Sequence, residues 1–361
     1  MAGSRQSAIG LELTGGAEPW LKKVAVVIPC RNETNTILEV VAALPAGLGQ
    51  WLVVDNGSSP QCQALLRREI PEGNLLQTPG ALGVGGAFLA GCRNLNPGID
   101  WICKLDGDGQ FCDVDLKQLF RIAVSSDAAL VKTARCNQQG WGVEPERSGS
   151  RHWGNQLLTL LLAMGSGYYL LEDGTSGLFL IKRQALEVAS ILGGLRLDHG
   201  FETSLLLNLG GVGADVVELR VPVRYWEQRG RTFSGRALAF PLAWCLIRGG
   251  WRRLLRTHLL YRLSPGGILL AAASVLVILG MGLGIYASIK ALGAGAPTTP
   301  GISAAATSLL SWGLIATLGF VAYDFASTFR RFCCKTAFGC WQPIATQGIQ
   351  ATRAHQAKRP S

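Results

Sequence analysis

Two carboxylates one residue apart follow a strand-like apolar run near the middle of this chain. Asp106 and Asp108 stand in the stretch WICKLDGDGQ, residues 101–110. In an extended segment, residues two apart point to the same side, so both carboxylates can address one ion. Such hard oxygen ligands suit Mg²⁺ or Mn²⁺, which keep coordination places for phosphate oxygens and water. Asp-Gly pairs also mark ordinary turns, so the stretch alone leaves a plain turn open.

The segments around this motif predict an α/β fold with a doubly wound sheet. Apolar runs of strand length alternate with helical patterns, as in a series of βα units. We expect strands at residues 23–30, 51–55, 74–77, 101–105 and 128–132, and helices at residues 34–44, 60–69, 85–94 and 114–125. The first run, KVAVVIPC, is apolar almost throughout, which is typical of a strand buried on both faces.

Polar clusters follow three of these strands. Ligands of open α/β sheets collect at the carboxyl ends of the strands, so the three clusters predict a nucleotide pocket along one edge. The clusters are Pro29 with Asn32 and Glu33, Asp55 with Gly57 and Ser58, and the Asp106/Asp108 pair. Ordinary loop chemistry is the alternative, because loops also favour these residue types.

A glycine-rich loop, residues 83–87, precedes the third expected helix. It follows the third strand and not the first, which excludes a dinucleotide fingerprint. Gly85 and its neighbours would bring backbone N–H groups and a helix start close to a ligand. A plain glycine turn is an equal alternative.

The last third of the chain predicts a membrane hairpin. No charged side chain occurs from Leu263 to Ile289, and a second apolar run spans residues 302–323. The 24 residues from Gly266 to Ile289 would make a helix of roughly 36 Å, enough to cross a hydrocarbon core of about 30 Å. Arginines and lysines crowd both outer flanks, and only Lys290 lies between the runs. The catalytic region and both termini are therefore expected on the cytoplasmic side of the inner membrane.

Composition narrows the expected partners. The chain has 34 basic against 24 acidic residues, and the basic ones gather beside the apolar runs. This placement favours anionic lipid headgroups over nucleic acid. The ten cysteines include no C-x-x-C pair, which favours a reduced, zinc-free protein. Residues 235–263 mix Leu, Phe and Trp with arginines, as an amphipathic juxtamembrane segment or a plain positive flank would.

Together the motifs resemble the family 2 glycosyltransferases of the GT-A fold, in the branch of dolichol-phosphate mannosyltransferase and bacterial polyprenyl-phosphate glycosyltransferases. The resemblance divides the chain into a disordered leader (1–21), a GT-A domain (22–234), the juxtamembrane segment (235–263), two transmembrane helices (264–327) and a basic cytoplasmic tail (328–361). It implies a nucleotide-sugar donor, UDP-glucose first, an acceptor such as undecaprenyl phosphate, and Mg²⁺ or Mn²⁺ as cofactor. It also leaves open a homo-oligomer built through the membrane hairpin.

The resemblance assigns a role to each motif. A P-x-x-N-E pattern and a D-G-S motif line the nucleotide pocket of relatives, and they are matched here by Pro29, Asn32, Glu33, Asp55, Gly57 and Ser58. The metal motif D-x-D-x-Q is matched by Asp106, Asp108 and Gln110. Relatives hold phosphates with arginines at the places of Arg135 and Arg151, and their D-x-T-S-G acceptor loop is matched from Asp173 to Gly177. Glu202 resembles the acidic residue of a late helix.

Three positions depart from the family pattern. Val84 and Phe179 stand where many relatives have Lys and Arg. Residues 229–234 only loosely resemble the R-x-x-G-x-S-K phosphate clamp, because the final Lys is missing. Arg229 and Arg231 would supply positive charge there, although Arg and Lys differ at a phosphate.

The implied reaction is one inverting displacement. A polyprenyl monophosphate is largely a dianion at neutral pH and needs no general base. Arg135, Arg151, Arg229 and Arg231 would neutralise donor and acceptor, and Asp173 would orient a substrate unless it is a turn aspartate. Two rivals remain: a family 2 transferase using a lipid or glycan hydroxyl, and a non-catalytic nucleotide-sugar-binding membrane subunit.

Overall fold

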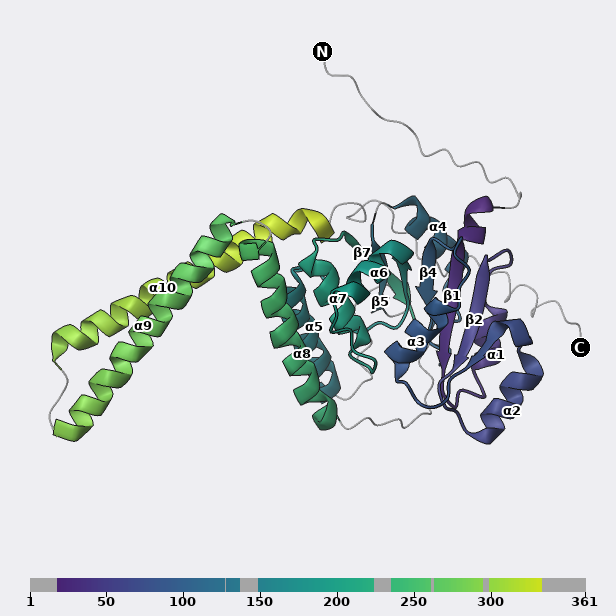
Figure 1. Cartoon of the computed structure of the whole chain (residues 1–361), viewed down its shortest axis with the longest axis horizontal. Helices are drawn as coiled ribbons and strands as arrows, with labels where there is room; N and C mark the ends of the chain where they lie inside the picture. The colour runs from purple at the N-terminus through teal and green to yellow at the C-terminus, as the bar shows by residue number, and fades with distance from the viewer. Residues whose placement is uncertain are drawn as a thin grey trace, which may run out of the picture.

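A seven-stranded mixed sheet forms the centre of the N-terminal domain (Figure 1). The computed structural model describes residues 18–126, 128–136, 149–223, 235–260, 263–294 and 299–332. The strands are β1 (Val24–Cys30), β2 (Gln50–Asp55), β3 (Leu75–Gln77), β4 (Trp101–Lys104), β5 (Leu130–Cys136), β6 (Phe179–Lys182) and β7 (Val216–Pro222). Their order is β3-β2-β1-β4-β6-β5-β7.

Helices cover both faces of this sheet. They are α1 (Ile37–Ala42), α2 (Pro60–Glu69), α3 (Val84–Arg93), α4 (Leu116–Ser125), α5 (Gly149–Ser166), α6 (Arg183–Ile191) and α7 (Phe201–Gly211). Short 3₁₀ turns at Pro19–Lys23 and Glu72–Asn74 complete the described secondary structure of the domain. The α/β prediction is confirmed, and α2 has the predicted bounds.

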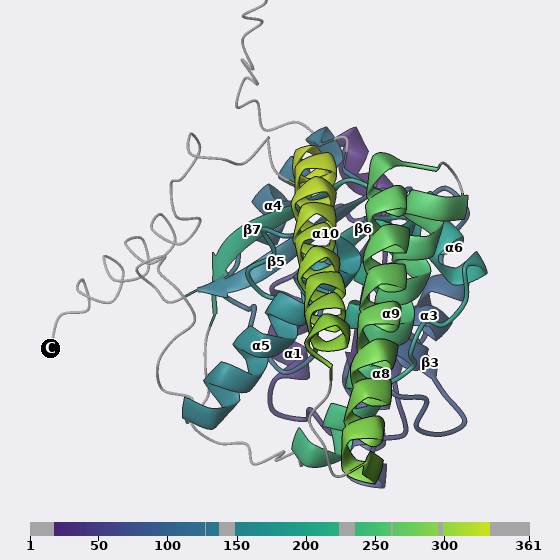
Figure 2. The ribbon, with the colours of Figure 1, turned by 90° about the vertical axis from the view of Figure 1, so that its left-hand side faces the viewer.

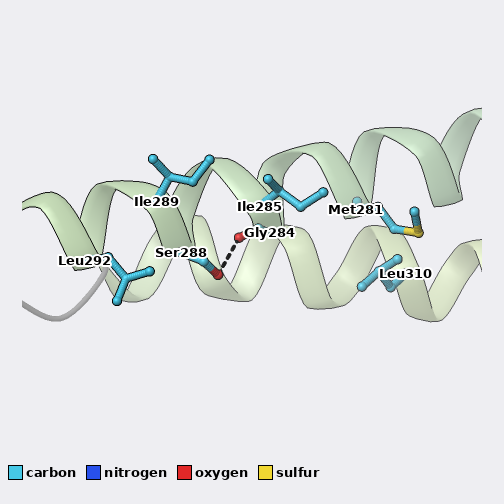
Figure 3. Close-up of a pocket in the computed structure, with 8 residues that line it drawn as sticks. Met281, Gly284, Ile285, Ser288, Ile289, Leu292 and Leu310 are labelled. Atoms are coloured by element: carbon cyan, nitrogen blue, oxygen red, sulfur yellow. Dashed lines mark hydrogen bonds between the residues drawn. The ribbon is translucent and has the colours of Figure 1, made fainter.

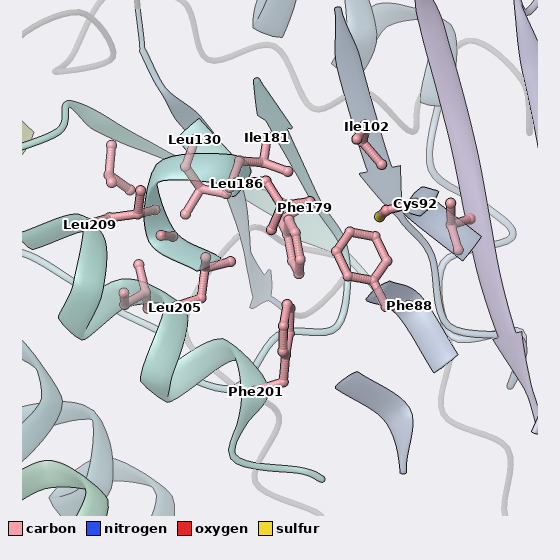
Figure 4. Packing of buried hydrophobic residues seen from close by; sticks show 14 of the residues in the cluster. Phe88, Cys92, Ile102, Leu130, Phe179, Ile181, Leu186, Phe201, Leu205 and Leu209 are labelled. Atoms are coloured by element: carbon pink, nitrogen blue, oxygen red, sulfur yellow. The ribbon is translucent and has the colours of Figure 1, made fainter. Parts of the chain in front are cut away.

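Side chains of β1 alternate between two hydrophobic cores. Ala25 and Val27 pack with α3 and α7 on one face, whereas Val24, Val26 and Ile28 pack with α1, α2 and α4 on the other. In the first core, Phe88 lies edge-on to both Phe179 and Phe201 (Figure 4). Burial on both faces explains why the strand sequence is apolar almost throughout.

Strand β6 was not predicted, and it changes the sheet. It runs antiparallel to both β4 and β5 and inserts between them. A four-residue run such as Phe179–Lys182 is too short for sequence periodicity to identify. The insertion has a consequence for the site, because the loop that enters β6 is carried to the carboxyl end of β4.

Several predicted bounds are wrong, and two of these differences bear on the site. Helix α1 starts at Ile37 and not at residue 34, because residues 33–36 form a turn, from which Thr36 donates a hydrogen bond to the turn after β4. Strand β4 ends at Lys104, so the two carboxylates lie in the turn after the strand.

Three long helices follow the domain. Helix α8 (Gly235–Leu255) packs against α5 and α7 and continues into a π-helical turn, Arg256–Leu260. Helices α9 (Pro265–Ala294) and α10 (Pro300–Phe332) form a hairpin that projects away from the domain (Figure 1). By length and composition each contains a 29-residue segment that suits a membrane span, at Pro265–Gly293 and Pro300–Thr328.

A buried ionic cluster joins the hairpin to the domain. Asp324 of α10 accepts hydrogen bonds from both terminal nitrogens of Arg253, at 2.6 and 2.7 Å, and from Tyr169 Oη at 2.5 Å. His258 Nε2 lies 2.8 Å from the same carboxylate. Because Tyr169 belongs to the domain and Arg253 to α8, one carboxylate links three parts of the chain.

An apolar groove of about 450 Å³ lies on the hairpin, far from this joint. Its lining includes Met281, Gly284, Ser288 and Leu310 (Figure 3). Ser288 donates its hydroxyl hydrogen to the Gly284 carbonyl at 2.9 Å, so its polar group is satisfied within the helix. Assembly of copies through the hairpin stays a prediction.

Candidate active site

The turn after β4 brings the two carboxylates together. The Gln110 N–H donates to Asp108 Oδ1 at 3.1 Å, and Gly109 takes a positive φ of 79°, which glycine adopts without strain. Burial and then the charge of Asp106 raise the pKa of Asp108 to about 6. The two negative charges therefore repel each other, and a bound cation would reduce this repulsion.

These carboxylates fit a divalent cation of the Mg²⁺ or Mn²⁺ type. Among the described residues no cluster of three acidic, His or Cys ligands exists. Such a cation is commonly bound by one or two carboxylates and completed by substrate phosphates and water. Asp106 and Asp108 would hold it, with Gln110 beside them, and it would supply charge to a departing diphosphate.

A buried lysine stabilises the first carboxylate. Lys104 is 1% exposed, and its Nζ lies 2.5 Å from Asp106 Oδ1 and 3.0 Å from Glu202 Oε1. Burial lowers the pKa of Lys104, but the two carboxylates outweigh it and raise that pKa above its usual value. Lys104 thus links the carboxylate pair to helix α7. The sequence analysis missed this residue, although a lysine inside the apolar run WICKL was a visible signal.

The ends of β1 and β2 form a second wall of the site. The strands pair in parallel with Cys30 opposite Asp55. Asn32, at φ 61°, donates its N–H to Ser58 Oγ at 3.0 Å, and Asn32 Oδ1 accepts from Ser59 N at 2.6 Å. Asp55 accepts the Ser58 N–H at 3.0 Å. The two clusters predicted at these strand ends therefore hold each other through backbone groups.

The carboxylate turn packs against this wall. Thr36 Oγ1 donates to the Gly107 carbonyl at 2.8 Å. A methyl group added at Gly107 would come within 2.3 Å of Glu33 Oε2 and 3.4 Å of the Pro29 carbonyl. The structure thus brings the three predicted strand ends together at one edge of the sheet. Gly57, at φ 71°, allows the loop after β2 to approach Ala81.

The glycine loop before α3 packs against protein. A methyl group at Gly85 would come within 2.7 Å of Phe201 and of the Arg196 carbonyl, and one at Gly83 within 2.3 Å of the Leu197 carbonyl. Close packing against residues 196–201 is therefore sufficient to explain these glycines. A ligand-binding role of Gly85 stays a prediction.

The predicted acceptor loop lies beside Asp106. A methyl group at Gly177 would come within 1.7 Å of Asp106 Oδ2, so only glycine fits there. At the start of the loop, Arg135 Nε donates to Asp173 Oδ2 at 2.6 Å and Arg135 Nη2 to Asp173 Oδ1 at 3.0 Å. Arg135 Nη2 also donates to Thr175 Oγ1 at 2.7 Å. Arg135 and Asp173 thus form a bidentate, largely buried pair.

Electrostatics keep Asp173 ionised. Burial raises its pKa, but the charges of Lys132 and Arg135 and hydrogen bonds from Arg135 and Thr175 hold that pKa well below its usual range. Lys132 is itself 1% exposed, and burial lowers its pKa. Asp173 is therefore fixed as an anion within the domain.

Glu218 positions the same loop from β7. Its carboxylate accepts the N–H groups of Glu172 at 2.7 Å and Asp173 at 3.1 Å. Burial raises the pKa of Glu218 to about 7, even though Lys132 and the two N–H groups oppose the rise. Lys104, Phe179, Lys132 and Glu218 pair across β4, β6, β5 and β7 in one cross-strand row. Sequence reasoning missed Glu218 and Lys132, which are charged residues inside strand-like runs.

The remaining predicted residues are only partly placed. Arg151 belongs to α5, but its side chain lies outside the described part of the structure. Arg229 and Arg231 lie outside the described residues. Glu202 is buried on α7 and pairs with Lys104, as stated above.

A seven-stranded mixed sheet that is covered on both faces, with an acidic pair after one strand, is typical of a GT-A domain. Residues 25–189 match the family model described as glycosyl transferase family 2. This segment is therefore a family 2 glycosyltransferase domain, and the resemblance read from the sequence is confirmed for the family and the GT-A fold. The polyprenyl-phosphate branch within that family stays a prediction.

Solved structures support the fold. Glucosyl-3-phosphoglycerate synthase from Mycobacterium tuberculosis, in complex with Mn²⁺, UDP-glucose and phosphoglyceric acid, is 18% identical with a TM-score of 0.50, over 63% of this chain and 80% of that chain. Its complex with UDP is 16% identical with a TM-score of 0.49, over the same shares of the two chains. At 18% identity, the first of these similarities shows the fold alone. No curated protein matches the chain by sequence.

Proposed function

We propose that this protein transfers a hexose, glucose first, from a nucleotide sugar to a polyprenyl phosphate at the cytoplasmic face of the membrane. The observation that carries the proposal is the contact of the acceptor loop, through Gly177, with Asp106. The acceptor loop thus lies next to the carboxylates that would address the donor diphosphate. The two membrane-length helices favour a lipid as the acceptor.

The state of Asp173 favours a phosphate over a hydroxyl acceptor. A hydroxyl must lose its proton as it attacks, and this requires a base within reach. Both oxygens of Asp173 are occupied by Arg135, and the low pKa of Asp173 makes it a poor base. A phosphate monoester brings its own negative charge, so it needs cationic surroundings more than a base.

The chain's own residues then have separate tasks in a single inverting displacement. Asp106 and Asp108 would hold a divalent cation, which would supply positive charge to the diphosphate. Asn32, Asp55 and Ser58 shape the pocket for the base and ribose. Arg151, Arg229 and Arg231 are proposed to hold phosphate groups, whereas Arg135 fixes Asp173 and contributes charge from there.

The test is a transfer assay with purified full-length protein in detergent. Labelled UDP-glucose, UDP-galactose, UDP-GlcNAc and GDP-mannose are each offered with undecaprenyl phosphate and Mg²⁺ or Mn²⁺. We expect an acid-labile glycolipid from one donor, and a loss of at least about 100-fold in the Asp108→Asn variant. Asp113→Asn, in the following loop, is the matched control. Transfer to a hydroxyl lipid only, or no transfer despite nucleotide-sugar binding, would refute the proposal.

A further inference from the structure

The segment that leads from α5 into the predicted acceptor loop contains turns but no helix or strand. It comprises residues 167–172 and ends directly before Asp173, the first residue of the loop. We call it the entry segment. Because no ladder of a helix or sheet holds these residues, contacts with neighbouring elements must fix their course. The position of the acceptor loop therefore depends on what holds the entry segment.

Tyr169 ties the entry segment to the hairpin. Its Oη donates to Asp324 Oδ2 at 2.5 Å, and its ring lies edge-on to that of Phe325, with the ring centroids 5.2 Å apart. Asp324 is buried, and a hydrogen bond to a carboxylate is stronger than one between neutral groups. Two consecutive residues of α10 thus contact one tyrosine of the domain.

This contact is additional to the joint between α8 and the hairpin. Arg253 alone donates two hydrogen bonds to Asp324, so the carboxylate has a full counter-charge without the tyrosine. Gly167, at φ 82°, lies so close that a methyl group there would come within 2.3 Å of Arg253 Nη2. The entry segment is therefore shaped to lie against this cluster, and the Tyr169 hydroxyl adds a bond from it to α10.

The other end of the entry segment is held by β7. Glu218 accepts the N–H groups of Glu172 and Asp173, and α10 also packs against β7. Figure 2, which looks onto the domain from the hairpin, shows α10 on the side of β5 and β7. Only three residues separate Tyr169 from Asp173. A stretch this short leaves little slack, so a shift of Tyr169 would move the start of the acceptor loop.

The wall at the ends of β1 and β2 is held in another way. Its hydrogen bonds join neighbouring loops to each other, as from Asn32 N to Ser58 Oγ and from Ser59 N to Asn32 Oδ1. These bonds do not pass through α10. A change at the hairpin is therefore expected to reach the acceptor loop and to spare the nucleotide pocket.

We propose that the hairpin positions the acceptor loop through the hydrogen bond from Tyr169 to Asp324. Both are positioning residues, because they act on transfer through the loop. The link between hairpin and loop requires only the contacts given above. Its role in transfer rests on the proposed lipid-phosphate acceptor, which shares the bilayer with the hairpin, so the bond would keep the loop in register with its substrate.

Tyr169→Phe is the variant that isolates this bond. It keeps the ring and its edge-on contact with Phe325. Asp324 keeps the hydrogen bonds from Arg253 and the contact with His258, so the joint between α8 and the hairpin stays intact. A general loss of folding is therefore not expected.

The link is tested by hydrogen exchange of the full-length protein in detergent. We expect the Glu172 and Asp173 amides to exchange about tenfold faster in Tyr169→Phe, and the amides of residues 56–59 to be unchanged. Tyr286→Phe, which removes an exposed hydroxyl on α9, is the matched control and should change neither. Unchanged exchange at Glu172 and Asp173, or equal acceleration at both places, would overturn the link.

The role in transfer is tested with the same variants. For Tyr169→Phe we expect kcat/KM for undecaprenyl phosphate to fall about tenfold, with UDP-sugar affinity in calorimetry unchanged. Tyr286→Phe should match the original protein in both. Faster exchange with an unchanged kcat/KM would refute the positioning role. Faster exchange in the variant, with no lipid product from the original protein, would refute the proposed acceptor and leave the link between hairpin and loop intact.

Discussion

The two halves of the site are built by different interactions. At the ends of β1 and β2, backbone N–H groups and short polar side chains hold one another, as in the bond from Asn32 N to Ser58 Oγ. Beside β4, β5 and β7, buried charges from distant parts of the chain form ion pairs, such as Lys104 with Glu202 and Arg135 with Asp173. We call the first region the proposed donor half and the second the proposed acceptor half. We expect the donor half to tolerate the loss of one contact, and the acceptor half to require a partner for every buried charge.

The largest expected effect is that of Lys104→Met. The change leaves Asp106 and Glu202 close together without their shared cation, and breaking a buried pair costs about 3–5 kcal/mol. We expect a loss of this size in the free energy of unfolding, measured by chemical denaturation in detergent. Lys23→Met, which breaks the exposed Lys23–Asp100 pair, should cost less than about 1 kcal/mol. Equal losses in the two variants would contradict the dependence of the acceptor half on its buried charge pairs.

Asp173→Asn should separate turnover from donor binding. The variant leaves Arg135 and Lys132 without their anion, so the acceptor loop loses its fixed position. We expect turnover to fall on the order of 100-fold, while calorimetry finds UDP-sugar affinity nearly unchanged. Asp198→Asn breaks the more exposed Arg196–Asp198 pair and serves as the control. A parallel loss of donor affinity would show that the two halves are one unit.

The raised pKa of Glu218 predicts that the stability of the folded protein depends on pH. Its pKa is raised from 4.5 to about 7 in the folded protein, so the folded state retains a proton that the unfolded state has released. Stability from this group is complete below about pH 4.5 and is lost as the pH rises through about 7. Glu218→Gln stays neutral, so its stability relative to the original protein should increase with pH between 5 and 8.

Denaturation curves across that pH range provide the measurement. Glu172→Gln alters an exposed carboxylate that pairs with Arg220 and should give a nearly constant offset. Parallel pH profiles for Glu218→Gln and the original protein would contradict the raised pKa.

The smallest effect is expected for Ser58→Ala in the donor half. The Asn32 N–H loses one hydrogen-bond acceptor, which is worth about 1 kcal/mol. UDP-sugar affinity should weaken about fivefold, with turnover at saturating donor retained. Thr34→Ala, which removes an exposed hydroxyl contact with Asn35, is the control. A loss of turnover as large as that of Asp173→Asn would remove the difference between the halves.

This contrast also explains what the sequence predicted well. The donor half consists of consecutive βα units, so apolar periodicity and turn residues locate β1, β2 and α2. The acceptor half depends on pairs separated by 38 to 98 residues, such as Arg135 with Asp173 and Lys104 with Glu202. No local pattern encodes such pairs. A lysine or glutamate within an apolar strand signals that a partner exists, but only the fold identifies it.

Helix α5 was missed for a related reason. Apart from Gln156, its exposed side chains from residue 153 onward are apolar, so the sequence GNQLLTLLLAMGS lacks the polar stripe that marks a helix on a water-exposed surface. Strand β6 was missed because it has only four residues. The predicted acceptor loop lies between α5 and β6 and was identified by its D-x-T-S-G motif. Only the structure showed which residues hold it in position.

The carboxylate of Asp324 determines whether the N-terminal domain can be separated from the helical hairpin. A membrane anchor that makes no contacts with a catalytic domain can be removed without destabilising that domain. In this protein, truncation before Pro265 would remove Asp324. The buried guanidinium of Arg253, which is 1% exposed, would then lose its carboxylate partner, and so would Tyr169 and His258. The hairpin is thus part of the folding unit of the protein. A different hairpin in its place would need an acidic residue at the position of Asp324 to pair with Arg253.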